Sequence, residues 1–154
     1  YMNVYGPRQD YHGAYIAVIM KILDNLDKGL PPSVYGDGSQ AYDFVYVGDC
    51  AKANVCAMKA DAVDEFYNVG TGKRTTIKEL AELILELTGS DLELQYLPEG
   101  QTFVKNRIGC PKKATEQIGY TGHVELREGL LALIDWRNNH KTEVDARRKA
   151  AQHA

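Results

Sequence analysis

The sequence Asn-Val-Gly-Thr-Gly at residues 68–72 is the first candidate for chemistry, because its glycines precede a predicted helix. A glycine turn at a helix N-terminus can present amide hydrogens to a phosphate. This turn lacks both the G-x-G-x-x-G spacing of dinucleotide loops and the lysine with serine or threonine of a P-loop. We therefore interpret it as a strand-to-helix turn, with Thr71 as a candidate lining residue.

Two cations, Lys105 and Arg107, lie in the polar segment 101–109. Arg107 is the better candidate for a phosphate ligand, because a planar guanidinium donates two parallel hydrogen bonds where lysine offers a point charge. A cation in a loop is commonly only solvated, and this alternative stays open. His12 could act as an acid or base, although a surface histidine is the commoner role. Residues 36–54 contain no paired nucleophile and base.

Composition sets the broad class. The chain has 154 residues, of which 44% are hydrophobic and 25% charged, as in one ordinary globular domain. A net charge of −3 with dispersed lysines and arginines argues against nucleic acid and favours a small-molecule partner. No apolar run reaches the ~18 residues of a membrane span, and no signal peptide opens the chain, so we expect a cytoplasmic protein with no membrane partner.

The three cysteines are expected to be free thiols, because their number is odd and no secretory signal accompanies them. Their spacing fits no zinc pattern, and the four histidines are scattered far from them, so no metal site is expected. These cysteines are Cys50, Cys56 and Cys110.

The elements that must position these residues follow from periodicity and punctuation. We predict strands at 1–5, 34–35, 43–47, 65–69 and 92–97, helices at 15–26, 49–60, 76–89, 111–118 and 125–138, and a solvated or frayed charged tail at 142–154, in part an expression scar. The glycine-rich residues 36–39 predict a tight hairpin between the second and third strands. Asp43 and Asp49 are expected to be structural, holding this hairpin and capping the next helix. Thr76 and Glu79 form a capping box.

Three segments, taken together, resemble a known family. They are the opening Tyr-Met-Asn-Val-Tyr-Gly-Pro-Arg-Gln, the stretch from Gly36 to Asn54, and Phe-Tyr-Asn-Val-Gly-Thr-Gly at 66–72. The chain resembles the carboxyl-terminal, substrate-binding part of an extended short-chain dehydrogenase/reductase. The specific family is that of the NAD-dependent sugar-nucleotide epimerases and dehydratases of the UDP-glucose 4-epimerase-like kind, and the resemblance covers residues 1 to about 141.

The resemblance implies a mixed α/β fold, the carboxyl-terminal part of a Rossmann-type protein, with short parallel and antiparallel strands and five or six helices. It implies that residues 1–12 form the end of a Rossmann-type sheet strand and a link, that 13–141 form the substrate-binding lobe, and that 142–154 are a charged tail. One sheet edge should be incomplete, where a larger parallel sheet would continue.

The implied site has three parts. Tyr1 and Met2 would border the nicotinamide of NAD, while Asn3 donates to the diphosphate of the nucleotide sugar; the alternative is that Asn3 only satisfies backbone groups. The strand at Val34 and Tyr35 would offer backbone groups to the base, with the Tyr35 ring as an aromatic surface. The alternative for this pair is a packed hairpin.

Tyr42 is the main departure from the family, which commonly has an arginine there on the nucleotide phosphates. A phenol donates one hydrogen bond but carries no charge, so the phosphate clamp must be weaker or rebuilt. The family has a further arginine before a late helix, and Arg107 is the residue here that would rebuild the clamp. Gln40 could add polar contacts, although a place in the surface turn is the commoner outcome.

The catalytic parts of the family are absent from this sequence, which has neither the glycine-rich dinucleotide loop nor the tyrosine-lysine pair. No residue of the chain is therefore assigned a catalytic role. We expect a fragment of a longer enzyme, inactive alone, whose parent uses NAD for transient hydride transfer at a sugar ring carbon; a natural short protein is the alternative. The expected partner is a nucleotide sugar, a UDP-sugar foremost. A stand-alone nucleotide-sugar-binding or protein-interaction module without catalysis is the alternative function, and the oligomeric state is not indicated.

Overall fold

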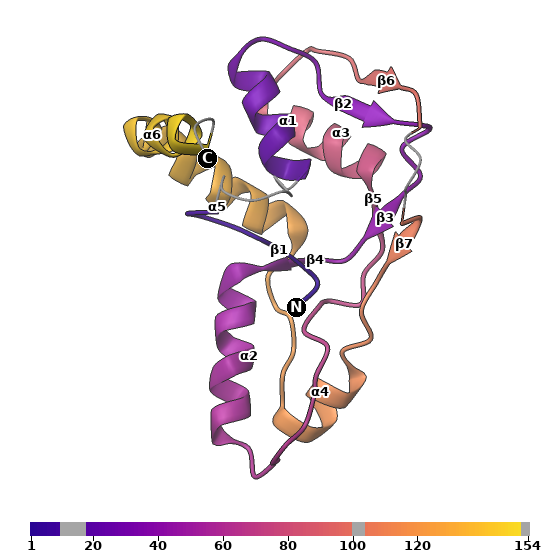
Figure 1. The fold of residues 1–154 in the computed structure, drawn as a ribbon, viewed down its shortest axis with the longest axis vertical. Helices are drawn as coiled ribbons and strands as arrows, with labels where there is room; N and C mark the ends of the chain where they lie inside the picture. The colour runs from indigo at the N-terminus through magenta and orange to yellow at the C-terminus, as the bar shows by residue number, and fades with distance from the viewer. Residues whose placement is uncertain (10–17, 100–103, 152–154) are drawn as a thin grey trace.

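The computed structural model describes residues 1–9, 18–99 and 104–151. These residues form an elongated mixed α/β molecule, with α2 and α4 at one end and the other helices at the opposite end (Figure 1). The helices are α1 (Val18–Asp27), α2 (Val47–Lys59), α3 (Ile77–Thr88), α4 (Lys112–Ile118), α5 (Leu126–Asn139) and α6 (Lys141–Ala151). The strands are β1 (Asn3–Tyr5), β2 (Ser33–Tyr35), β3 (Ala41–Tyr42), β4 (Phe44–Tyr46), β5 (Thr75–Thr76), β6 (Gln95–Leu97) and β7 (Asn106–Arg107). Short parallel and antiparallel strands with six helices confirm the predicted fold class.

The strands form three small sheets. β1 and β4 pair in parallel, as do β2 and β6, while β3 lies between antiparallel β5 and parallel β7. The predicted hairpin is therefore wrong, because β2 pairs with neither β3 nor β4 among the described strands. The glycine turn itself forms, since Gly38 donates to the Tyr35 carbonyl, but it leads the chain from one sheet into another.

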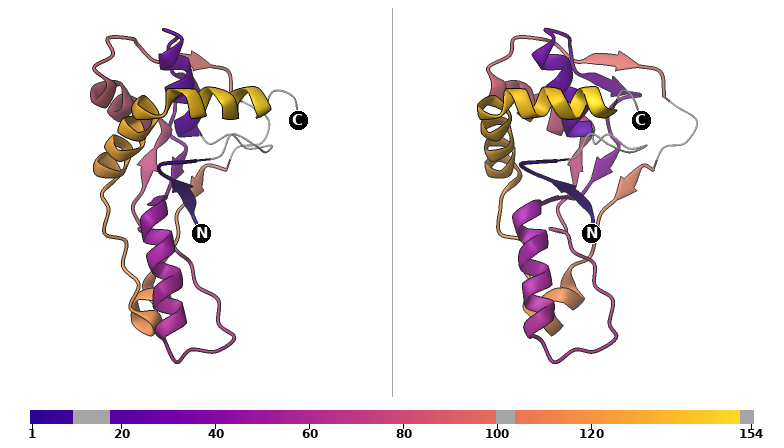
Figure 2. Two further views of the ribbon diagram at one scale, coloured as in Figure 1. Left: turned by 90° about the vertical axis from the view of Figure 1, so that its left-hand side faces the viewer. Right: turned by 60° about the vertical axis from the view of Figure 1, so that its left-hand side comes forward.

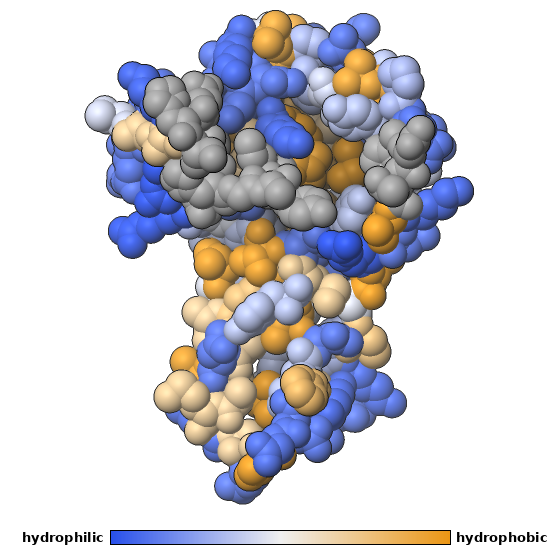
Figure 3. Space-filling model, in the orientation of Figure 1, coloured by the Kyte–Doolittle hydropathy of each residue, from blue (hydrophilic) through white to orange (hydrophobic). Residues whose placement is uncertain are grey.

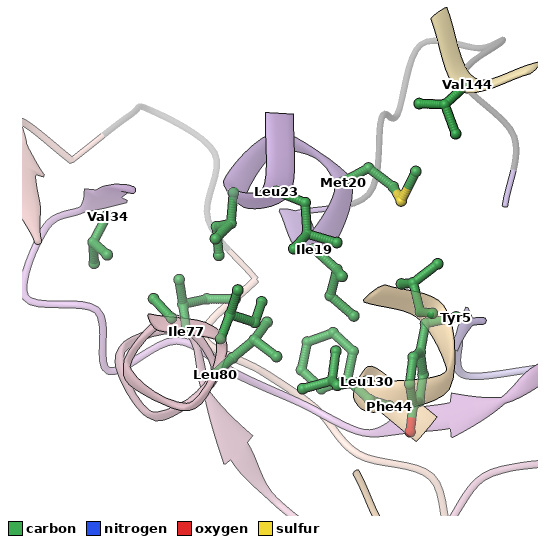
Figure 4. Close-up of a cluster of buried hydrophobic side chains, with 14 residues drawn as sticks. Tyr5, Ile19, Met20, Leu23, Val34, Phe44, Ile77, Leu80, Leu130 and Val144 are labelled. Carbon is green, nitrogen blue, oxygen red and sulfur yellow. The ribbon is translucent and has the colours of Figure 1, made fainter. Parts of the chain in front are cut away.

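Two hydrophobic clusters meet at β4. Phe44 belongs to the larger cluster, formed by α1, α3 and α5, and Val45 to the smaller one beside α2 and α4. This division follows from the alternation of side chains along a strand. Figure 4 shows residues of the larger cluster, including Leu23, Leu80 and Leu130, converging between the helices.

Local signals set most helix ends correctly. Thr76 and Glu79 form the predicted capping box, and Gly89 and Gly119 end their helices in the left-handed conformation. The predicted cap at Asp49 is wrong: α2 begins two residues earlier, and the buried Asp49 lies in its first turn. Its carboxylate accepts the backbone N–H groups of His123 and Val124, both at 3.0 Å, and so fastens the segment before α5.

Two further predictions require correction. Residues 65–69 form no strand, although the Met2 N–H donates to the Val69 carbonyl at 2.8 Å. The tail is not simply solvated up to residue 151, because α6 buries Val144 and pairs Arg148 with Asp24 of α1. Figure 2 shows α6 running across the end of the molecule that contains α1. Residues 15–17 of the predicted first helix and 152–154 of the tail lie outside the described residues.

Other described features bear on the class of protein. No helix within the described ranges has the length and apolarity needed to cross a membrane. The same ranges contain no group of three or more His, Cys, Asp or Glu side chains placed to hold a metal ion. The cysteines are free thiols, with Cys50 buried and Cys110 exposed.

Candidate functional site

Asp43, at the junction of β3 and β4, is fully buried and ties three segments of the chain together. Its carboxylate accepts the Thr71 N–H at 2.9 Å, the Thr71 hydroxyl at 2.6 Å and the Gly72 N–H at 2.8 Å. It also accepts the Gly109 N–H at 3.3 Å. Asp43 is thus structural, as predicted, but it holds the 70–72 turn and the segment after β7 rather than a hairpin.

The glycines at 70 and 109 permit this arrangement by their lack of a side chain. A Cβ at Gly70 would lie 2.5 Å from an Asp43 carboxylate oxygen and 2.7 Å from Met2 Cγ, and one at Gly109 would lie 2.8 Å from the same Met2 atom. The turn therefore accommodates the protein's own carboxylate. The Tyr120 hydroxyl also binds this turn, by donating to the Gly70 carbonyl at 3.1 Å. Burial raises the pKa of this phenol.

The backbone of Asp43 contacts two of the predicted ligand residues. Its N–H donates to the Arg107 carbonyl at 2.9 Å, while its carbonyl accepts the Asn3 N–H at 3.0 Å. The Asn3 side-chain amide also donates to this carbonyl at 3.0 Å, which is the backbone-satisfying role considered as its alternative. A carboxamide has two N–H donors and one carbonyl acceptor, so this bond leaves Asn3 with capacity for another partner.

Tyr42 and Arg107 are direct neighbours across the parallel pair of β3 and β7. Paired residues of adjacent strands project to the same face of a sheet, so the phenol and the guanidinium lie on one side. The Tyr42 hydroxyl donates to the Val104 carbonyl at 3.2 Å, and its ring contacts that of Phe44, with centroids 6.3 Å apart. Phe44 is in turn the register partner of Asn3. The fold therefore gathers three of the predicted ligand residues around the junction of β3 and β4.

Arg107 has the exposure that a ligand-binding cation requires. It is an exposed residue at the end of β7, and no acidic side chain of the described chain forms an ion pair with it. The sequence left open whether this cation is only solvated, and its exposure is compatible with either role. The pairing with Tyr42 gives its position in the fold.

Val34 and Tyr35 lie in a different sheet. The Gly36 N–H donates to the Leu97 carbonyl at 2.8 Å on the β6 side. Because alternate residues of a parallel strand face the same neighbour, the Val34 backbone also faces β6, and the Tyr35 backbone faces the other edge. The Val34 side chain is buried, while Tyr35 is half exposed.

Gln40 links the two sheets. It is buried, contrary to its expected place in the surface turn, and its side-chain amide donates to the Tyr35 carbonyl at 2.8 Å. Sequence reasoning missed this contact, because nothing in the local pattern distinguishes an amide that folds under the turn from one that faces solvent. β2 is thereby tied to the residue just before β3.

Tyr1 and Met2, the predicted cofactor neighbours, differ in their surroundings. Tyr1 is 64% exposed, and its hydroxyl donates to the side-chain carbonyl of Asn54 in α2 at 2.8 Å. Met2 packs against the two glycines described above. Figure 3 shows apolar residues at the narrow middle of this face, where β1 and β4 lie. His12, the candidate acid or base, lies outside the described residues.

Two cavities lie away from these residues. One, of about 430 Å³, is lined by residues of α2, α4 and the segment 62–67, and the other, of about 260 Å³, lies between α5 and α6. Neither lining contains a predicted site residue. The candidate site is therefore a set of hydrogen-bond donors on the surface beside β3 and β7, with a phenol, a guanidinium and an amide suited to an anionic ligand.

Comparison with known proteins places this geometry in context. Residues 1–70 match the NAD dependent epimerase/dehydratase family. A putative UDP-glucose 4-epimerase of Methanocaldococcus jannaschii is 39% identical over 145 residues, which are 92% of this chain and 46% of that protein. A UDP-N-acetyl-alpha-D-glucosaminuronate decarboxylase of Bacillus cytotoxicus is 31% identical over 142 residues, 88% of this chain and 44% of the relative.

A solved structure agrees with these sequence relatives. The UDP-glucose 4-epimerase of Thermotoga maritima, crystallised with UDP-glucose, superposes with a TM-score of 0.83 and 37% identity, over 90% of this chain and 44% of that one. The chain spans about half the length of the relatives that it matches. In sequence and in fold, it is similar to part of the UDP-glucose 4-epimerase-like extended short-chain dehydrogenases/reductases, the NAD-dependent epimerase/dehydratase family.

Proposed function

We propose that this chain is the nucleotide-sugar-binding portion of an NAD-dependent sugar-nucleotide epimerase or dehydratase, with a UDP-sugar as its ligand. The observation that carries the proposal is the pairing of Arg107 with Tyr42 beside Asn3. A guanidinium without an acidic partner in the described chain, next to a phenol, supplies the donors that a diphosphate needs. The similar epimerase crystallised with UDP-glucose supports the choice of ligand.

Each ligand residue has a proposed role. Arg107 and Tyr42 bind the diphosphate, and the remaining donor capacity of Asn3 points to the same group. The strand at Val34 and Tyr35 forms the base side of the site, with its backbone groups and the Tyr35 ring toward the base and the buried Val34 side chain holding the strand in the core. The similar proteins include both an epimerase and a decarboxylase, so the similarity supports a nucleotide-sugar ligand more strongly than one reaction.

NAD belongs to the parent protein in this proposal, and polypeptide outside this chain would make most of the contacts with NAD. The sequence has no glycine-rich loop to hold a pyrophosphate, and Met2 packs inward on two glycines, so the residues present fit only the edge of a dinucleotide. The exposed ring of Tyr1 is the surface of this chain that suits such an edge. NAD would supply hydride transfer at a ring carbon of the sugar.

The proposed division of the chain follows the same logic. Residues 1–12 belong with a Rossmann-type sheet through β1, residues 13–141 form the substrate-binding lobe, and residues 142–154 form a tail that docks through α6. The open side of the two-stranded sheet of β1 and β4 is the edge at which a larger parallel sheet would continue.

Isothermal titration calorimetry with UDP-glucose, UDP and uridine tests the proposal. We expect the chain to bind UDP-glucose and UDP, and Arg107→Ala to weaken both by about 10- to 100-fold, the loss typical of a charge-assisted hydrogen bond. Arg127→Ala is the matched control, since it removes an equal charge from an exposed ion pair with Glu86 on other elements. Absence of binding to every nucleotide sugar would refute the proposal.

The alternative, a binding or interaction module without catalysis, has one observation in its favour. Met58, Val63 and Phe66 are apolar and 85%, 77% and 90% exposed at the α2 end of the molecule. The upstream coding sequence separates the two possibilities, since both expect no turnover of UDP-glucose with NAD by this chain alone. The proposal expects an upstream glycine loop in frame, whereas a natural start codon immediately before Tyr1 favours the module.

A further inference from the structure

Asp43 secures the backbone at and just after Arg107, the proposed diphosphate ligand. Its N–H donates to the Arg107 carbonyl, and its carboxylate accepts the N–H of Gly109, two residues further on. β7 is only two residues long and, among the described strands, pairs with β3 alone, so few other backbone bonds in the described chain hold this segment. We propose that Asp43 is a positioning residue that fixes Arg107 for the diphosphate, an inference that rests on the proposed function.

The carboxylate is itself held rigidly. Thr71 donates its N–H and its hydroxyl, and Gly72 donates a second N–H, so the Asp43 carboxylate accepts three hydrogen bonds from one turn in addition to the one from Gly109. Hydrogen bonds to an ionised acceptor are stronger than neutral ones, and burial removes the competition of water. The turn at 70–72 thus acts as an anchor from which Asp43 reaches the segment after β7.

A carboxylate near a phosphate site would normally repel the ligand. Here the charge of Asp43 is enclosed by four hydrogen-bond donors, and its side chain is fully buried. Tyr42 precedes it on the chain and shares a face with Arg107, so the alternation of side chains directs Asp43 to the opposite side. The residue can therefore orient the guanidinium without opposing the anion that the guanidinium binds.

The same residue carries the Asn3 contacts. The Asp43 carbonyl accepts both the backbone and the side-chain N–H of Asn3, so two of the proposed diphosphate ligands depend on one backbone position. A shift of Asp43 would move Arg107 and Asn3 together. The affected property would be the diphosphate contribution to affinity rather than recognition of the base.

The measurement is therefore a ratio, the dissociation constant for uridine divided by that for UDP, which isolates the diphosphate contribution. Asp43→Asn keeps the size of the side chain but turns N–H groups toward the donors of Thr71, Gly72 and Gly109. We expect this variant to lower the ratio about tenfold or more, while the affinity for uridine changes by less than about threefold. Arg107→Ala should lower the same ratio. The double variant should lose less than the two single losses combined, because both changes act on the contact made by Arg107.

Folding is checked by circular dichroism, since Asp43→Asn disturbs a buried network. If Asp43→Asn does not give the wild-type spectrum, Thr71→Val decides, because it removes one donor to the carboxylate and leaves a shape-matched side chain. The inference then expects a two- to fivefold fall in the ratio, and an unchanged ratio overturns it. Failure of the wild-type chain to bind UDP removes the proposed function, whereas binding with a ratio unaffected in a folded Asp43→Asn variant overturns this inference alone.

Discussion

Substitution of Gly70 by alanine tests the packing around Asp43 by sterics alone. The backbone of Gly70 does not have a positive φ, so alanine is compatible with its conformation. The added Cβ would lie 2.5 Å from Asp43 Oδ2 and 2.7 Å from Met2 Cγ, both far inside van der Waals contact. The carboxylate cannot retreat without stretching its bonds to the neighbouring Thr71 and Gly72.

The expected cost has two parts. Overpacking a filled site costs about 1–3 kcal/mol. Loss of one hydrogen bond to the buried carboxylate adds about 1.5–3 kcal/mol, the range for charged groups. The two costs do not add fully, because a carboxylate that moves away from the new methyl group relieves the overpacking as it loses a hydrogen bond. We therefore expect Gly70→Ala to lower the free energy of unfolding by about 3 kcal/mol.

Gly89→Ala provides the matched comparison. Gly89 ends α3 with φ of 63° and has no atom within 4 Å of an added Cβ, so alanine there incurs only the cost of the left-handed backbone, about 1–2 kcal/mol. Urea unfolding of both variants, followed by far-UV circular dichroism and by the fluorescence of Trp136, gives the two values. A Gly70→Ala chain more stable than Gly89→Ala would refute the picture of a filled, rigid Asp43 site.

Four further changes have defined outcomes. Thr76→Ala should cost about 1 kcal/mol in urea unfolding through loss of the α3 cap. The hydrogen bonds from Thr76 lower the pKa of Glu79 in the folded chain. The stability that the ionised Glu79 contributes should therefore be present at neutral pH and be lost as pH falls through this lowered pKa. A pH series of unfolding measurements should show no such dependence in Glu79→Gln. Arg137→Met removes a buried partner of two α1 carboxylates and should lower the free energy of unfolding by about 1–3 kcal/mol. This is below the usual cost of breaking a buried ion pair, because Arg148 still pairs with Asp24. The exposed Arg127→Met should cost less in the same assay. Tyr42→Arg should raise the calorimetric affinity for UDP about tenfold, and an unchanged affinity would place the phosphates elsewhere.

The features predicted correctly from the sequence are those with local causes. The capping box at Thr76 and the helices predicted at 111–118 and 125–138 depend on residues within a few positions of one another. Strand partners have no such local cause. The turn at 36–39 has hairpin residues, yet β2 pairs with β6, some 60 residues further along the chain. Short strands satisfy their backbone wherever the packed helices bring an edge, and residue type does not encode that partner.

The hydrogen-bond partners of the two aspartates, like the strand partners, could not be predicted from local sequence. Asp49 has the residue type of a helix cap, and its buried carboxylate instead receives N–H groups from residues more than 70 positions away. Asp43 was expected to support a hairpin and supports the 70–72 turn. In both cases the sequence indicated a structural carboxylate, but not its partners. The donors came from distant loops, because a buried carboxylate needs several donors and the local backbone offers too few.

The departure at Tyr42 can be understood from the strand that contains it. β3 is paired on both edges, and its backbone contacts at Ala41 and Asp43 are made by N–H and carbonyl groups that any side chain leaves intact. The residue at position 42 can therefore change from a cation to a phenol without altering the strand. Arg107, its partner across the pair, lies on the same face and retains a full charge. Under the proposed function, phosphate affinity at position 42 can therefore change while the backbone bonds of Asp43 to the 70–72 turn stay the same.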